Sequence, residues 1–159
     1  MALRKILTDK EPALHKVCKP VTSFDKKLHK LLDDMAETLA EAQGVGLAAP
    51  QVGILRRVVL VDTGEGILEL INPTLVETDG EQVGPEGCLS VPGKYGLVKR
   101  PYYAKVRAQD RYGEWFEAEG EELIGRCFCH ELDHLDGILY TQVMDRFLTE
   151  EELCYDEEE

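Results

Sequence analysis

The sequence predicts an α+β fold in which antiparallel sheets pack around a central helix that carries paired histidines, with another helix near the N-terminus. Apolar residues recur at helical spacing near each end of the chain, and runs rich in β-branched and aromatic residues gather between them. Strands grouped between helices are typical of α+β proteins. The length of 159 residues suits one domain with a substantial core.

The first helix is expected in the segment that follows Ser23. Apolar side chains recur there at helical spacing from Phe24 to Leu39. Ser23 is a suitable N-cap, and Gly44 is a suitable stop.

Two strands are expected next, over 57–62 and 68–73, and 75–78 can continue the second of them. The turn between them, at 63–66, contains glycine. A connection this short favours antiparallel pairing.

Further strands are expected over 104–109 and 114–118, on either side of a Tyr-Gly turn at 112–113. A last helix follows over 121–136, and Gly137 marks its end. Its acidic first turn would complement the positive end of the helix dipole.

The last helix contains the sequence His-Glu-Leu-Asp-His at positions 130–134. His130 and His134 lie about 40° apart around a helix axis, so both imidazoles can bind one metal ion. Glu131 lies about 60° further round, where it can act on water at the ion without replacing it. A surface helix with solvated histidines is the alternative, but chance gives the motif in a chain of this size only about once in a hundred. The pattern indicates a metal-dependent hydrolase.

A catalytic site of this kind needs three protein ligands and an open position. Cys127 shares the histidine face, but roughly 10 Å of helix rise separates it from His134, so one straight helix cannot supply all three ligands. The metzincin pattern is also excluded, because Tyr140 stands where a metzincin has its last histidine. The acidic C-terminal run could supply a glutamate but resembles a solvated charge run. Cys88, in the Gly-bounded run 86–90, is the favoured third ligand, although a lone cysteine is about as often a small buried residue.

The segment 44–53 reads GVGLAAPQVG. It fits a variant of the dinucleotide-binding loop, but a helix precedes it and Pro50 interrupts any helix that follows, so a nucleotide site is not expected. Together with Glu-Gly-Cys-Leu-Ser at 86–90 and the histidine motif at 130–134, this segment closely resembles the peptide deformylases. The resemblance runs over about 6–145.

The resemblance implies an enzyme that removes the formyl group from the N-terminal formylmethionine of newly made polypeptides. It implies metal ligands at Cys88, His130 and His134 and a catalytic glutamate at Glu131. It also implies one divalent metal ion, iron(II) in the cell, with zinc, nickel or cobalt replacing it in preparations.

The resemblance further implies two donors for the oxyanion of the reaction, the side chain of Gln51 and the backbone N–H of Leu89. Taken alone, Gln51 would be interpreted as an amide that caps a loop. Glu86 is implied to be held by Arg100, and this pair would fix the loop that carries the cysteine ligand.

An apolar slot for methionine is implied to be lined by Val45, Tyr95 and Cys127, each of which would also suit a plain core position. The backbone from Gly44 to Gly46 and the strand of the cysteine ligand can pair with an extended peptide by strand addition. Such pairing tolerates varied sequence beyond the first residue.

The formal net charge of −13 and the pI near 4.7 argue against a nucleic-acid partner. No apolar run approaches the roughly 20 residues that a membrane span needs, and the N-terminus lacks a signal segment. We therefore expect a soluble protein that is not exported, and the resemblance to the deformylases implies a cytoplasmic location of the bacterial type or a bacterially derived organelle. The five cysteines, an odd number, fit reduced thiols better than a disulfide framework.

We expect a catalytic domain over residues 1–147 and an acidic tail over 148–159. The expected partners are N-formylmethionyl peptides and nascent chains. In some deformylases a basic C-terminal helix is thought to contact the ribosome, and the acidic tail argues against that docking mode. A frayed terminus that aids solubility is the preferred interpretation.

Two other functions are kept as alternatives. A metallopeptidase with a downstream glutamate ligand would cleave internal peptide bonds and would not need Cys88. A non-enzymatic metal site would need a fourth protein ligand, for which Cys127 or Cys129 is the candidate.

Overall fold

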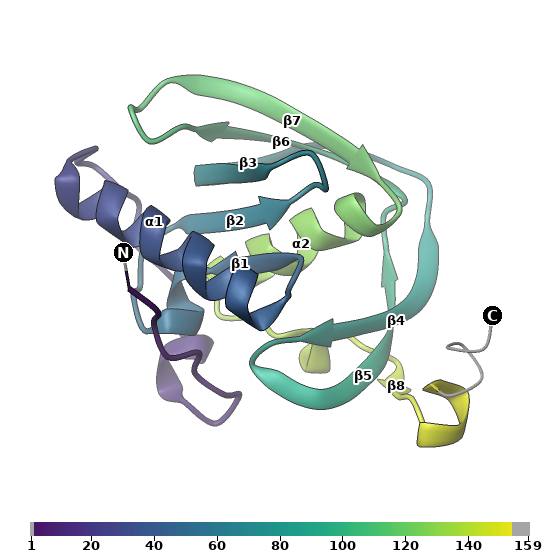
Figure 1. Cartoon of the computed structure of the whole chain (residues 1–159). Helices are drawn as coiled ribbons and strands as arrows, with labels where there is room; N and C mark the ends of the chain where they lie inside the picture. Colours follow the sequence, from purple (N-terminus) through teal and green to yellow (C-terminus); the bar gives the residue numbers. More distant parts are fainter. Residues whose placement is uncertain (1, 154–159) are drawn as a thin grey trace.

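A computed structural model of the protein describes residues 2–153 (Figure 1). The two long helices are α1 (Lys26–Ala42) and α2 (Leu123–Leu135). The strands are β1 (Gly46–Ala48), β2 (Val58–Asp62), β3 (Ile67–Asp79), β4 (Gln82–Cys88), β5 (Val91–Arg100), β6 (Tyr103–Gln109), β7 (Trp115–Glu121) and β8 (Arg146–Phe147). Short 3₁₀ helices are η1 (Pro12–His15), η2 (Ala49–Val52) and η3 (Tyr140–Gln142).

The larger sheet has five strands in the order β1-β2-β3-β6-β7, and every neighbouring pair is antiparallel. Its strand β2 is buried on both faces. Val59 and Val61 pack in the cluster that contains α2, whereas Val58 and Leu60 pack in the cluster that contains α1. This alternation explains the uninterrupted apolar run of β2, since each face of the strand has its own helix to cover it.

The smaller sheet, β4-β5-β8, is also antiparallel and packs against the other side of α2. Its own core is small and is built on Val91, Val98 and Tyr140. In Figure 1 α2 runs between the two sheets, and His130, Glu131 and His134 on it are buried. The predicted α+β fold, with antiparallel sheets around a central histidine-bearing helix and a helix near the N-terminus, is confirmed.

Both predicted helix starts differ from the structure. Asp25, not Ser23, caps α1, because its side chain accepts a hydrogen bond from the Leu28 backbone N–H. The predicted acidic first turn of α2 is wrong: Glu121 ends β7 and Glu122 is the N-cap residue. The strand β7 extends further than its apolar pattern indicated, since its last residues pair with β6.

The helix ends are closer to prediction. The C-cap of α1 is Gln43, in the left-handed conformation at φ 56°, one residue before the predicted stop at Gly44. Gly137 follows α2 with φ +77° and donates its backbone N–H to the carbonyl oxygen of His134, as a terminating glycine does.

The predicted hairpins are present. β2 and β3 pair across the turn at 63–66, and β6 and β7 pair across the turn that contains Gly113. β3 continues through 75–78 to Asp79, as expected, with two register irregularities along its pairing with β6.

The chain stays hydrogen-bonded to the body beyond β8, since the Leu148 N–H donates to the Tyr95 carbonyl. Residues 150–153 form one helical turn, where Thr149 and Glu152 each accept a hydrogen bond from the other's backbone N–H. The rest of the predicted acidic tail, 154–159, lies outside the described residues.

The cysteines within 2–153, namely Cys18, Cys88, Cys127 and Cys129, are free thiols, and Cys154 lies outside the described range. No helix in the described part of the chain combines the length and the apolar character needed to cross a bilayer.

Candidate active site

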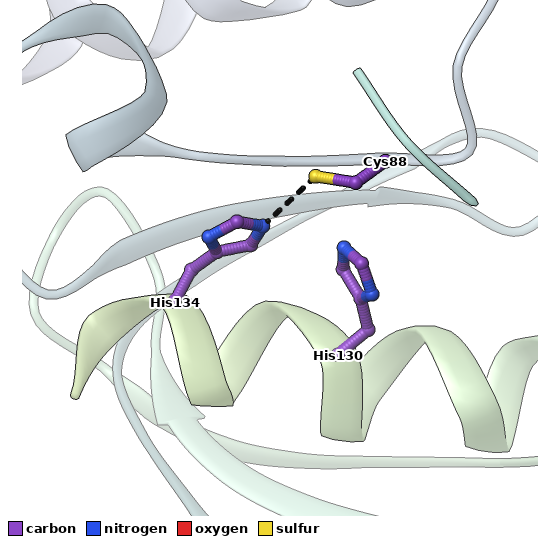
Figure 2. Close-up of side chains that lie close together, drawn as sticks. All are labelled: Cys88, His130 and His134. Atoms are coloured by element: carbon purple, nitrogen blue, oxygen red, sulfur yellow. Dashed lines mark hydrogen bonds between the residues drawn. The ribbon is translucent and has the colours of Figure 1, made fainter. Parts of the chain in front are cut away.

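Three side chains with metal-binding atoms meet where the smaller sheet touches α2. Cys88 comes from the end of β4, and His130 and His134 come from successive turns of α2, with their donor atoms all within 4.8 Å of one another. Figure 2 shows both imidazoles projecting from α2 toward Cys88, whose Sγ lies 3.3 Å from His134 Nε2. Residues 46 positions apart in sequence are therefore brought together as predicted.

Local structure explains how Cys88 reaches the histidines. The pairing of β4 with β5 shifts register between Glu86 and Cys88. Glu86 pairs with Gly96 and Cys88 with Val91, so the extra residues of this irregularity, 92–95, lie on β5 opposite Gly87. Gly87 also lies against the ring of Tyr95, because a Cβ there would be 2.6 Å from a ring carbon.

Glu86 binds three cationic or polar partners inside the protein. Arg100 donates to both of its oxygens, at 3.0 and 2.7 Å, Arg126 donates at 2.9 Å and His130 Nδ1 lies at 2.6 Å. Burial alone would raise the pKa of Glu86, but these hydrogen bonds outweigh it and lower the pKa to about 2. An ionised carboxylate only accepts hydrogen bonds, so His130 Nδ1 carries a proton and Nε2 is the nitrogen available to a metal.

The pairing of Glu86 with Arg100 was predicted, whereas Arg126 and Asp133 were missed. Arg126 lies one helical turn before His130 and also donates to the Val98 carbonyl. Asp133 accepts from Arg100 at 2.8 Å. An arginine four residues before a ligand histidine, on the buried face of the same helix, was the available signal for Arg126.

Glu131 is buried beside the cluster and has a different environment. Its Oε1 has no hydrogen-bond partner within residues 2–153. Burial raises its pKa to about 7. Gly46 permits its position, because a Cβ on Gly46 would lie 2.5 Å from Glu131 Oε2 and 2.7 Å from Cys127 Sγ.

Gln51 lies in η2 and faces the cluster. Its carbonyl oxygen accepts the Ala48 N–H at 2.9 Å, so its amide nitrogen points the other way, to Cys88 Sγ at 3.6 Å and Ser90 Oγ at 3.1 Å. Leu89 lies in the two-residue turn between β4 and β5, next to the cysteine. Both predicted oxyanion donors are thus close to Cys88.

A cavity of about 510 Å³ opens onto the cluster. Its lining contains all the residues predicted to contact substrate, namely Gly44, Val45, Gly46, Tyr95 and Cys127, and also Gln51, Glu86, Cys88, Leu89, His130 and Glu131. Burial raises the pKa of the Cys127 thiol, which keeps it neutral. Leu123 and Arg126 line the cavity as well and were not predicted. The volume falls within the range of small-molecule sites.

The alternative metal ligands do not join the cluster. Within residues 2–153 the group of neighbouring His, Cys, Asp and Glu donors contains Cys88, His130 and His134 only, so neither Cys127 nor Cys129 closes the site. Tyr140 is buried with its ring stacked 6.2 Å from that of His130.

The residues present fit a bound divalent metal ion. One thiolate and two imidazoles form a ligand set that accepts zinc, iron(II), cobalt and nickel. His130 presents Nε2, and burial lowers the pKa of His134 well below its usual value, so this imidazole is neutral as a ligand must be.

An α+β scaffold that places a three-ligand site, a buried glutamate and an amide donor around one cavity defines a metal-dependent amide hydrolase. Residues 3–150 match the family described as Polypeptide deformylase. The chain belongs to this family.

Relatives agree with the family match. The peptide deformylase of Agathobacter rectalis is 57% identical over 145 residues, covering 91% of this chain and 92% of that protein. The crystal structure of a peptide deformylase from Legionella pneumophila has a TM-score of 0.87 at 39% identity and covers 98% of this chain and 92% of that one. The structure of the enzyme from Thermotoga maritima has a TM-score of 0.87 at 42% identity, with coverage of 90% and 98%. The alternative of a metallopeptidase has no support in these matches.

Proposed function

We propose that this protein removes the formyl group from the N-terminal formylmethionine of newly made polypeptides and releases formate. The observation that supports this most directly is that Cys88, His130 and His134 meet at a cavity whose lining includes Glu131 and Gln51, in a deformylase-family chain.

Cys88, His130 and His134 would hold the metal ion. A divalent ion bound there supplies Lewis acidity toward a carbonyl oxygen and makes water a better nucleophile near neutral pH. Glu86 orients His130 through its Nδ1 hydrogen bond, and the two arginines keep Glu86 ionised.

Glu131 is the proposed general base and acid. Its carboxylate lines the cavity and has an oxygen without a partner in the described chain, so it can accept a proton from the attacking water. The same carboxyl then donates that proton to the departing amine nitrogen. Burial keeps the proton affinity of Glu131 high enough for both steps.

Gln51 and Leu89 are the proposed oxyanion donors. The hydrogen bond from Ala48 to the Gln51 carbonyl oxygen holds the amide nitrogen toward the cavity, where negative charge develops on the formyl oxygen. The Leu89 N–H would donate from the turn that follows Cys88.

The substrate would lie along β1. This strand is at the edge of the larger sheet and, among the described residues, pairs only with β2, so an extended peptide can add to its other side near Gly46. The methionine side chain would enter the part of the cavity lined by Val45, Tyr95 and Cys127, with Gly44 close by.

The test is to measure formate release from a formyl-methionyl peptide and amine release from its acetyl counterpart, with metal-loaded protein. We expect turnover of the formyl peptide only, lost in Cys88→Ala and retained in Cys129→Ala, a matched change of a cysteine outside the cluster. Equal turnover of both peptides, or cleavage of internal peptide bonds, would contradict the proposal.

For the metal, we propose iron(II) in the cell, with zinc, nickel or cobalt able to replace it. Anaerobic purification followed by elemental analysis should find about one iron per chain. Brief exposure to peroxide should inactivate the iron form faster than the nickel form, because peroxide readily oxidises ferrous iron beside a thiolate, whereas nickel(II) resists that oxidation.

We propose that the enzyme acts in the cytoplasm on N-formylmethionyl nascent chains, since its substrates are made there. We assign residues 1–147 to the catalytic domain and 148–159 to an acidic tail. A tail of this charge would not bind ribosomal RNA as a basic helix does, so any contact with the ribosome would use another surface.

A further inference from the structure

A second cavity of about 640 Å³ lies away from the active site, and none of its lining residues lines the first cavity. It is a groove between the first two turns of α1 and two extended segments, 19–23 and 54–56. These segments run side by side, joined by a parallel bridge between Lys19 and Arg56. We call it the basic groove, defined by Arg4, Lys19, Lys27 and Arg56 at its rim and Leu28, Leu31 and Ile54 on its floor.

The rim carries free positive charge. Lys19, Lys27 and Arg56 are exposed, and within the described residues none of them forms an ion pair. Arg4 is neutralised by Asp34, at 2.9 Å. One acidic residue, Asp25, lies in the lining of the groove.

The charge of the whole chain makes this groove unusual. Residues 1–30 contain eight Lys and Arg and three Asp and Glu, which gives a net charge of +5. Residues 31–159 contain ten Lys and Arg and 28 Asp and Glu, which gives a net charge of −18. The rim cations come from this basic N-terminal part and from Arg56. The groove therefore lies in the basic part of an otherwise acidic chain, where exposed cations can attract an anionic ligand.

The shape and lining select the kind of anion. The part of the chain that lines the groove contributes no aromatic ring, so the stacking platforms used by single-stranded nucleic acid are missing. A phosphate at the start of α1 would meet the Asp25 carboxylate, which already caps that helix by accepting the Leu28 N–H at 3.1 Å. Leu28 and Leu31 form a buried apolar floor that suits aliphatic side chains.

We propose that the basic groove is a docking site for an acidic peptide segment of a partner protein, one that places an apolar side chain on the floor and carboxylates against Lys19, Lys27 and Arg56. The volume accommodates a few residues. The binding is independent of the deformylase reaction, because the two cavities share no residues.

The test is fluorescence anisotropy with a labelled glutamate-rich peptide that carries two central leucines, titrated with the full-length enzyme. We expect saturable binding that weakens about tenfold between 50 mM and 500 mM salt, because screening acts on exposed charges. A peptide with glutamine in place of glutamate should bind at least about tenfold more weakly. The variant Lys19→Glu/Arg56→Glu should lose at least as much affinity while its formate release is unchanged.

The matched control is Lys5→Glu/Lys10→Glu, which changes the net charge equally at exposed positions outside the groove and should keep most of the affinity. Absence of saturable binding, or equal affinity in the Lys19→Glu/Arg56→Glu variant, would overturn the proposal. So would tighter binding of a single-stranded RNA of equal charge. Low-salt self-association in sedimentation velocity that disappears when the chain is cut after residue 153 would assign the groove to a second copy's acidic tail and would also overturn it.

Discussion

Two buried glutamates, 45 residues apart in sequence, line the same cavity, but their pKa values are shifted in opposite directions. Glu86 on β4 is held by two arginines and a histidine, and its pKa is lowered to about 2. Glu131 on α2 has an oxygen with no partner in the described chain, and burial raises its pKa to about 7.

In the proposed mechanism, this difference separates a carboxylate that positions a metal ligand, Glu86, from a carboxylate that reacts, Glu131. Both oxygens of Glu86 are engaged in hydrogen bonds with Arg100, Arg126 and His130, so this carboxylate stays charged and fixed over the whole working pH range. Oε1 of Glu131 is buried and has no hydrogen-bond partner in the described chain, so no hydrogen bond offsets the free-energy cost of removing it from water. Substitutions that treat the two glutamates alike should therefore have different consequences.

The largest expected effect is on activity, in Glu131→Gln. We expect formate release to fall about 10²- to 10⁴-fold, the usual contribution of a general acid and base. The free energy of unfolding should not decrease, because the substitution removes the charge of a buried carboxyl whose Oε1 has no partner in the described part of the chain. Parallel measurements of kcat/KM and of the urea midpoint check this. A fall of less than tenfold would mean that another group handles the proton.

The next effect is on stability, in Glu86→Gln. Removing the charge leaves Arg100 and Arg126 buried without their shared carboxylate, so we expect a loss of about 3 to 5 kcal/mol in urea unfolding. The matched control Asp133→Asn removes the other, more exposed partner of Arg100 and should cost less. Equal losses in the two variants would show that burial does not set the strength of these pairs.

Gly46→Ala tests whether the placement of Glu131 depends on close approach of β1. The new Cβ would lie 2.5 Å from Glu131 Oε2 and 2.7 Å from Cys127 Sγ, so side chains on α2 must move. We expect a stability loss of about 1 to 3 kcal/mol and a lower kcat. Gly46→Ala should cost less stability in a Cys127→Ala background, because removing Sγ clears that contact without placing glycine inside α2, whereas an equal cost would place the strain elsewhere.

The smallest effect is expected for an exposed pair, Arg146–Glu152. Hydrogen bonds from Arg146 and the Thr149 N–H lower the pKa of Glu152 to about 2 from its usual 4.5, so its contribution is full above about pH 4.5 and disappears as the pH falls to about 2. The Tm difference between the wild type and Glu152→Gln, followed from pH 6 downward, should be about 2 °C or less and shrink with acid. A difference that grows at low pH would contradict this.

Much of the fold and the candidate site could be predicted from local patterns. The spacing of His130 and His134 determines that they share a helix face. The uninterrupted apolar run between two turns predicts the strand β2. Cys88 was favoured because it lies in a Gly-bounded strand, and resemblance to a family supplied the partner roles of Gln51 and Arg100.

The parts that were missed depend on pairings that sequence order hides. Arg126 is an ordinary helix residue until β4 and β5 bring Glu86 and the Val98 carbonyl to it. Glu121 belongs to β7 because it pairs with Tyr103, which no local propensity of glutamate indicates. Asp25 and Ser23 are both good N-cap residue types. The residue at which α1 begins, Lys26, determines that Asp25 is the one that caps it.

The three proposed ligands also come from two parts of the fold that have separate apolar cores. Cys88 is carried by the smaller sheet, whose own apolar core is slight, and the histidines by a helix seated on the larger one. An ion shared between them would act as a crosslink. Chelation should therefore speed amide exchange and proteolytic cutting in β4 and β5 before it disturbs β2 and β3, so ageing of the enzyme and its clearance by proteases would begin at the same place.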